Sequence, residues 1–144
     1  MKLKPDTYFF ICAAFAVVAD ICYPIRVINF YNIFGAIFII PGLCLTVWAN
    51  MALIKRKTSI QPYDTPTAFV TSGPFQFSRN PVYLGMAIIF FGFVFFLGSL
   101  SPYIFLIAFL IIIDRFIIQG EEIQLEDQFG EAYTHYKKKV RRWI

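Results

Sequence analysis

Charged side chains are scarce in this sequence. They make up 15% of the 144 residues, against about 25% in an average soluble domain. Histidine occurs once, at position 135, and the three cysteines, Cys12, Cys22 and Cys44, lie in apolar runs without a CxxC motif or the Cys/His spacing of a zinc site. These shortages argue against a soluble globular domain and against a disulfide framework, and we expect no metal ion.

Hydrophobic residues account for 58% of the chain, and 18 residues are phenylalanine. They gather in four segments, at positions 8–28, 31–54, 82–98 and 103–119. Because one helical crossing of a bilayer takes about 20 residues, a chain of this length has room for about four or five crossings and little else. The sequence therefore predicts an all-α fold, in which a single domain forms an integral membrane bundle of four transmembrane helices.

Basic residues flank these segments unevenly. Lys2 and Lys4 precede the first segment, a cluster at 55–57 follows the second, and a cluster at 137–142 closes the chain, whereas Arg26 is alone on the opposite side. The positive-inside rule then places both termini and the central loop in the cytosol. The net charge of +4 thus indicates membrane topology rather than nucleic-acid binding. We expect a multi-pass protein of a prokaryotic inner membrane.

The central cytosolic loop ends in a sequence that favours a helix start. Prolines interrupt residues 55–81 four times, so one long helix is excluded there. Pro81 suits the first turn of the next helix and Asn80 suits its N-cap. The exposed start of that helix, with Arg79 beside it, suits a carboxylate or phosphate group. An ordinary cap with an arginine at the lipid headgroups explains the pattern equally well.

The tail after the fourth segment is predicted to be an amphipathic helix with a break near Gly130, because apolar residues recur there at steps of three and four. Glu121 and Glu122 stand at the expected end of the apolar helix, where the helix dipole disfavours negative charge. Glu122 falls on the apolar face of the tail, which indicates a cationic partner. That partner is either Arg115 or a bound cationic ligand.

Two stretches in this order resemble a known family. Residues 71–85 read TSGPFQFSRNPVYLG, and residues 121–144 begin with the glutamate pair and end in RRWI. Both resemble signatures of the isoprenylcysteine carboxyl methyltransferase and phospholipid methyltransferase superfamily, as a small prokaryotic-type integral-membrane member. The likeness extends from about residue 57 to the C-terminus. The first two segments resemble the family only as apolar spans.

The resemblance implies an S-adenosylmethionine-dependent methyltransferase with two N-terminal spans in 1–54 and a cofactor-binding core in 55–144. Glu122 and Arg79 are the residues expected to act in catalysis. By position, the residues expected around S-adenosylmethionine are Ala68, Phe69, Val70, Phe75, Asn80, Pro81, Val82, Tyr83, Glu121 and Glu122. Carboxylates suit the ammonium and sulfonium of that cofactor, and Arg79 with the helix start suits its carboxylate.

The implied partners are the lipid bilayer and a lipophilic methyl acceptor: an isoprenylcysteine-like carboxylate, a phospholipid amine or another small membrane-soluble molecule. The isoprenylcysteine branch has histidine at Asn80 and a substrate-binding arginine at Ile117, so a prenylcysteine substrate is in doubt. A non-catalytic small membrane protein and a transporter subunit remain the alternatives.

Three further expectations concern single residues. Asp20 is expected to pair with Arg26 or to lie at the membrane interface, rather than to relay protons. The aromatic residues of the tail, Tyr133, Tyr136 and Trp143, are expected to form a belt at the membrane surface. His135 is expected to lie on the surface.

Overall fold

The computed structural model describes residues 4–26, 34–56 and 69–144, and these residues form helices joined by short turns. The helices are α1 (Pro5–Cys22), α2 (Gly35–Lys55), η2 (Gly73–Gln76), α3 (Pro81–Leu97), α4 (Tyr103–Ile112), η3 (Ile113–Ile118), α5 (Gln119–Phe129) and α6 (Glu131–Lys139). The predicted all-helical class is therefore confirmed for the described part of the chain, which contains no strand beyond one isolated bridge between Arg26 and Ser99.

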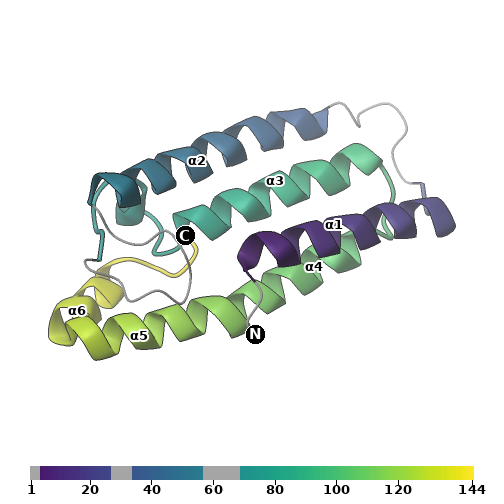
Figure 1. Ribbon diagram of the computed structural model, residues 1–144. Helices are drawn as coiled ribbons and strands as arrows, with labels where there is room; N and C mark the ends of the chain where they lie inside the picture. Colours follow the sequence, from purple (N-terminus) through teal and green to yellow (C-terminus); the bar gives the residue numbers. More distant parts are fainter. Residues whose placement is uncertain (1–3, 27–33, 57–68) are drawn as a thin grey trace.

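Figure 1 shows α1, α2, α3 and α4 lying alongside one another as an elongated bundle. α2 packs along α3, and α1 packs along α4. α5 continues beyond the bundle, α6 folds back, and the C-terminus returns to the start of α3 (Figure 1). The start of α3, the helix that leaves the bundle and the end of the chain therefore meet at one end.

α2 and α3 approach closely because glycines face one another at two levels. A methyl group on Gly85 would lie 2.2 Å from Thr46 Oγ1 and 2.8 Å from the Gly42 carbonyl oxygen. A methyl group on Gly35 would lie 2.4 Å from the Gly92 carbonyl oxygen. Small residues allow helix backbones to pack tightly within a membrane, where no hydrophobic force drives helices together. α2 stays helical through Pro41.

The core of the bundle is built from α1, α3 and the helix after Tyr103. Phe90 and Phe109 are fully buried, with ring centroids 5.4 Å apart, and Phe9 of α1 lies 5.7 Å from Phe109. Tilted and edge-on aromatic pairs of this kind are favourable. The outward faces of α1 and α2, in contrast, expose apolar side chains such as Phe10 and Met51, which is the pattern of helices that face lipid.

Within residues 4–26, 34–56 and 69–144, three helices are long and apolar enough to cross a membrane: Pro5–Cys22, Gly35–Lys55 and Tyr103–Phe129. α3 is apolar too, but has only 17 residues. It lies beside the longer helices (Figure 1). Three of the four predicted crossings therefore meet the length expected of a transmembrane helix, and the fourth is a shorter apolar helix.

The helix after Tyr103 does not end at Gln119 as expected. It continues without a break to Phe129, with a π-helical stretch at Ile113–Ile118. Glu121 and Glu122 therefore lie inside a helix, and the argument from an unfavourable helix end was wrong. The break near Gly130 is observed: Gly130 has φ +53° and separates α5 from α6.

The end of the bundle away from the C-terminus carries a small polar cluster. The carboxylate of Asp20 accepts a hydrogen bond from Ser99 and lies 3.7 Å from Arg26 Nη2. Arg26 also donates to the Leu97 carbonyl, at 3.0 Å, and Ser101 donates to the Tyr23 carbonyl, at 2.7 Å. The expected pairing of Asp20 with Arg26 is confirmed. The cluster ties the end of α1 to the turn between α3 and α4.

Candidate functional site

The loop before α3 is held in place by the last residues of the chain. The Arg79 backbone N–H donates to the Arg141 carbonyl at 3.0 Å. Ser78 Oγ and Asn80 Nδ2 donate to the Arg142 carbonyl, at 3.2 and 3.1 Å. Asn80 is the N-cap residue of α3, as predicted, but its side chain makes no capping hydrogen bond. Its amide nitrogen donates to the tail instead.

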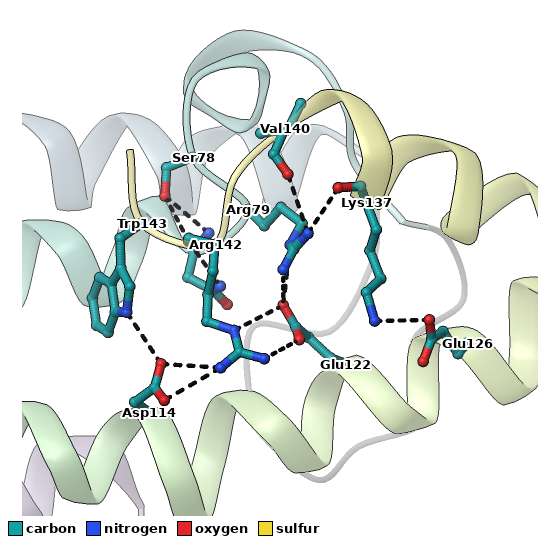
Figure 2. A network of polar contacts seen from close by, with 10 residues as sticks. Ser78, Arg79, Asp114, Glu122, Glu126, Lys137, Val140, Arg142 and Trp143 are labelled. Atoms are coloured by element: carbon teal, nitrogen blue, oxygen red, sulfur yellow. Dashed lines mark hydrogen bonds and ion pairs between the residues drawn. The ribbon is translucent and has the colours of Figure 1, made fainter.

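Glu122 is the centre of the polar network at this end (Figure 2). Glu122 is 4% exposed, and its carboxylate has two cationic partners. Arg79 Nη2 lies 2.7 Å from Glu122 Oε1, and Arg142 Nη2 lies 2.6 Å from Glu122 Oε2. Hydrogen bonding to Glu122 raises the pKa of the Arg142 guanidinium. The predicted cationic partner exists, but it is Arg79 with Arg142.

Arg115 is not the partner of Glu122. It is exposed, and its Nε lies 3.8 Å from Asp114 Oδ2, on the neighbouring residue of the same helix. The stripe that placed Arg115 on the face of Glu122 assumed a regular α-helix. The π-helical stretch at Ile113–Ile118 widens the turn and changes the direction of the side chains that precede the glutamates.

Asp114 extends the network towards the bundle. It accepts hydrogen bonds from Arg142 Nη1, at 3.2 and 3.3 Å, and from Trp143 Nε1, at 3.1 Å. Figure 2 shows Asp114 and Glu122 on the same helix, with the side chain of Arg142 between them. Asp114 lies within the unbroken helix Tyr103–Phe129, where Arg142 and Trp143 bind it.

The guanidinium of Arg79 also binds backbone carbonyls of the tail. Its Nη1 donates to the carbonyls of Lys137 and Val140, both at 3.1 Å (Figure 2). One guanidinium thus joins a buried carboxylate to the carbonyls that end α6, a position where positive charge is favourable. Because the guanidinium binds these carbonyls as well as Glu122, Arg79 links the loop before α3 to the tail.

Glu121 lies next to the network but has a different environment. Tyr83 Oη donates to Glu121 Oε1 at 2.6 Å. Within the described residues, neither an arginine nor a lysine pairs with Glu121, and no donor reaches its second oxygen. Neighbouring glutamates therefore differ sharply: Glu122 is fully engaged, whereas Glu121 keeps an acceptor for another molecule.

The aromatic residues of the tail face inward. Tyr133 is 2% exposed, and Tyr136 Oη donates to the Phe75 carbonyl at 2.6 Å. Phe69 lies 5.8 Å from Tyr133 and 6.0 Å from Tyr136, between ring centroids. Burial raises the pKa of Tyr136 to about 12 and that of Tyr133 further. With Trp143 bound to Asp114, the predicted surface belt was wrong.

An apolar cluster lies beside the polar network. Val70 and Phe75 of the loop pack with Ala49 of α2, and Val82 of α3 joins them. Asn50 follows Ala49 in α2, and its Oδ1 is buried without a hydrogen-bond partner in the described part of the structure. A buried amide oxygen without a donor is uncommon and indicates a place where another molecule supplies one.

The structure brings most of the predicted site residues to one end of the bundle. Ala68 lies outside the described residues. Phe69, Val70, Phe75 and Val82 form the apolar side. The polar side contains Arg79, Asn80, Pro81, Tyr83, Glu121 and Glu122.

Four residues of this end were missed from the sequence: Arg142, Asp114, Trp143 and Asn50. Arg142 was counted only as topological charge, although it stands beside a tryptophan in the ending that carries the resemblance. Asn50 could have been found as an amide inside an apolar span, because such groups are costly in a membrane and tend to be functional.

Three comparisons with known proteins bear on this site. A protein of Haemophilus influenzae (strain ATCC 51907 / DSM 11121 / KW20 / Rd), named "Uncharacterized protein", is 38% identical over 63 residues, which is 44% of this chain and 100% of that protein. No solved structure matches the chain. The family model "Phospholipid methyltransferase" matches residues 30–132, which include the loop, α3, both glutamates and Asp114. The chain therefore belongs to the phospholipid methyltransferase family.

Proposed function

We propose that the protein transfers a methyl group from S-adenosylmethionine to a lipophilic acceptor at the end of the bundle where α3 begins. The observation that carries the proposal is the pair of neighbouring glutamates. Glu122 is buried between Arg79 and Arg142, whereas Glu121 is bound by Tyr83 through one oxygen only. Such a site has a rigid polar base and one acceptor that can bind a cation.

The chemistry of the available groups fits this cofactor. S-adenosylmethionine carries an ammonium and a sulfonium, which the carboxylate of Glu121 can bind. Its adenine has an amino group, which can donate a hydrogen bond to the unpartnered Asn50 Oδ1. The half-buried ring of Phe69, with Val70 and Phe75, offers an apolar wall, and aromatic faces attract cations.

Glu122 and Arg79 remain in the proposed site, with a role that the contacts refine. Both are engaged with the tail and with each other. A direct bond to the cofactor would require one of these contacts to be exchanged. In our proposal they are positioning residues, which hold the loop 69–80 and the tail at a fixed separation from Glu121.

The bound cofactor would supply an activated methyl group on a positively charged sulfur. The protein would then have to align the acceptor with that methyl group and keep water out, which are the main sources of rate for such a displacement. Tyr83 fixes the carboxylate of Glu121. The packed residues of the loop and the tail close the site on the other side.

We further propose that α3 also crosses the membrane, so that the chain makes four crossings as one domain with residues 55–144 as its cofactor-binding core. A 17-residue helix rises about 25 Å at 1.5 Å per residue, close to the thickness of the hydrocarbon layer. Both termini and the site then face the cytosol, where the cofactor is dissolved. The basic tail and the 55–57 cluster support this orientation, and a prokaryotic inner membrane suits it.

The test is methyl transfer by the purified protein. The protein is reconstituted in vesicles of total bacterial lipid and incubated with methyl-labelled S-adenosylmethionine, and the labelled product is identified by mass spectrometry. Cofactor binding is measured separately by calorimetry. We expect binding and a labelled lipid-soluble product, and both are expected to weaken in Glu121→Gln. Absence of cofactor binding by the folded wild-type protein would overturn the proposal and favour a non-catalytic membrane protein.

A further inference from the structure

The tail of the chain carries positive charges that the polar network does not use. Lys137 and Arg142 are both paired with carboxylates. Lys138, Lys139 and Arg141, in contrast, are exposed, and no ion pair joins them to the described residues. Three cations within four positions of the chain are therefore available to an anion from outside the protein.

The fold presents these cations on a fixed backbone. α6 packs on the protein through its two buried tyrosines, and Lys138 and Lys139 lie on its exposed surface. The backbone carbonyl of Arg141 accepts a hydrogen bond from the Arg79 N–H at 3.0 Å, while the Arg141 side chain is exposed. The three side chains are thus held at one place by contacts of the loop and the tail.

The cations lie where the apolar part of the bundle ends. Arg141 is bound to Arg79, which is two positions before Pro81, the first residue of the apolar helix α3. Figure 1 shows α6 and the C-terminus at this end of the bundle. Because an apolar helix of a membrane bundle begins at the boundary between hydrocarbon and water, the three cations are at the level of the lipid headgroups.

Exposed apolar side chains lie beside the cations. Phe77 is 71% exposed and precedes Ser78, whose hydroxyl donates to the Arg142 carbonyl at 3.2 Å. Ile144, at the other side of Arg142, is 78% exposed. At a bilayer surface such side chains enter the boundary between headgroups and acyl chains. Basic residues with apolar ones among them are typical of surfaces that bind anionic lipid.

The exposed acids of the tail do not cancel this charge. Asp127 precedes α6 and Glu131 begins it, whereas Lys138 and Lys139 end it. Seven positions of helix separate Glu131 from Lys138, which is about 10 Å along the axis. This separation exceeds the Debye length of about 8 Å at physiological ionic strength. The end of α6 is therefore a local positive surface.

We propose that Lys138, Lys139 and Arg141, together with Phe77, form a docking surface for anionic phospholipids of the membrane that holds the protein. A phospholipid matches both parts of this surface, because its phosphate pairs with the cations and its acyl chains contact Phe77. A soluble anion matches the cations alone. The inference goes beyond the proposed function and does not depend on methyl transfer. Since the Arg141 backbone binds Arg79, bound lipid would also stabilise the loop before α3.

The experiment uses the two tryptophans of the chain. Trp48→Phe leaves Trp143, two positions after Arg141, as the single fluorophore. This protein is reconstituted in phosphatidylcholine vesicles with increasing fractions of phosphatidylglycerol that carries bromine on its acyl chains, and bromine quenches a nearby tryptophan. We expect phosphatidylglycerol to be preferred at Trp143 by at least about tenfold, since one basic side chain at an anionic surface is worth about fivefold in affinity.

Two changes should separate the roles of charge and ring. In Lys138→Gln/Lys139→Gln/Arg141→Gln, the preference for phosphatidylglycerol should fall to about twofold or less. Phe77→Ser should instead weaken quenching by both lipids and leave the preference unchanged. Salt at about 0.5 M should lower the preference of the protein with all three cations, a measurement that does not depend on the folding of the triple variant.

Lys55→Gln/Arg56→Gln is the matched control, because both residues are exposed cations at the end of α2. The preference at Trp143 should stay within about twofold of its starting value. An equal loss in this control would assign the effect to diffuse surface charge and overturn the proposal, as would the absence of any preference in the starting protein.

Thermal unfolding distinguishes a lipid from a free anion. In micelles of a neutral detergent, phosphatidylglycerol should raise the Tm of the wild-type protein, and inorganic phosphate at the same concentration should not. An equal rise with inorganic phosphate would indicate an anion site without lipid docking and overturn the proposal. All of these measurements are made without S-adenosylmethionine, so their outcome is independent of whether the protein transfers methyl groups.

Discussion

The two ends of the helical bundle both carry buried or half-buried charges, yet they differ in how completely these charges are paired. At the far end, Asp20 is bound by Arg26 and Ser99, and the Ser101 hydroxyl donates to backbone carbonyls of α1 and of Tyr23. At the end where α3 begins, Glu122 is bound twice, whereas Glu121 and Asn50 each keep an acceptor that no described residue binds. The far end is closed, and the other end has capacity for another molecule.

This difference shows that a polar cluster in a membrane protein is not by itself a site. Buried polar groups that satisfy one another stabilise a turn or a helix contact. Groups that remain unsatisfied after folding indicate a ligand, because leaving them so is costly.

The largest effect should come from removing the shared carboxylate of Glu122. In Glu122→Ala, Arg79 and Arg142 lose their partner, and the free energy of unfolding should fall by about 3–5 kcal/mol, the cost of breaking a buried ion pair. Thermal and denaturant unfolding in detergent measure it. Glu126→Ala is the control: Glu126 pairs with Lys137 at 2.8 Å in a half-exposed position, and should cost about 1 kcal/mol or less. Equal losses in both variants would show that the network is ordinary surface pairing.

The next effect should fall on activity rather than stability. Glu121→Gln removes the charge of the partly unpaired glutamate, and kcat/KM for methyl transfer should fall about 10- to 100-fold, as for the loss of a charged hydrogen bond. Tyr83→Phe, which removes the donor at 2.6 Å, should have a smaller effect in the same direction. Stability should change by less than about 1 kcal/mol. If Glu121→Gln instead unfolds the protein with no loss of specific activity, Glu121 is a structural residue.

Replacement of Asn50 should raise the stability of the protein but weaken its binding of S-adenosylmethionine. Asn50→Leu removes a buried oxygen that lacks a donor, so the protein without cofactor should gain about 1 kcal/mol. Binding of S-adenosylmethionine should weaken by roughly tenfold, since one hydrogen bond is lost. Unfolding and calorimetry on the same preparation give both numbers. If stability and cofactor affinity both rise or both fall in Asn50→Leu, a ligand-binding role of Asn50 is contradicted.

The smallest effect is expected at the closed end. Asp20→Asn keeps the size of the side chain and an acceptor for Ser99, but removes the pair with the half-exposed Arg26. Stability should fall by about 0.5–1 kcal/mol, and methyl transfer and cofactor affinity should stay at wild-type values. A marked loss of activity would mean that the two ends of the bundle are coupled, and that the comparison between them is too simple.

Much of this arrangement could be predicted from the sequence. The apolar runs predicted the helices, because helix formation in a bilayer depends on local composition. The turn at Gly130 and the start of α3 at Pro81 follow from glycine and proline. The expected gathering of Phe69, Tyr83 and the glutamates came from the order of two motifs, and the described members of that set do lie at one end.

Other features could not be predicted from periodicity. The partner of Glu122 was sought at Arg115, because a regular helix puts residues seven apart on one face; the π-helical stretch breaks that rule. Tyr133, Tyr136 and Trp143 were placed at the lipid surface, since aromatic residues are common there. Tyr133 and Tyr136 are buried instead and Trp143 is half-buried, because the tail folds back and offers Tyr136 a carbonyl partner and Trp143 a carboxylate partner.

By itself, the sequence determined that the protein lies in a membrane and that it is helical. With 58% hydrophobic residues among 144, too little polar surface remains to face water, and the division of these residues into apolar segments specifies helices. Only the tertiary structure decided which charges are paired. The ion pair of Glu122 with Arg79 joins residues 43 positions apart, and the hydrogen bond from Ser78 to the Arg142 carbonyl joins residues 64 positions apart. Both depend on distances that no local pattern encodes. The unpaired oxygens of Glu121 and Asn50 are what remains after those pairs form, and they are therefore visible only in the folded protein.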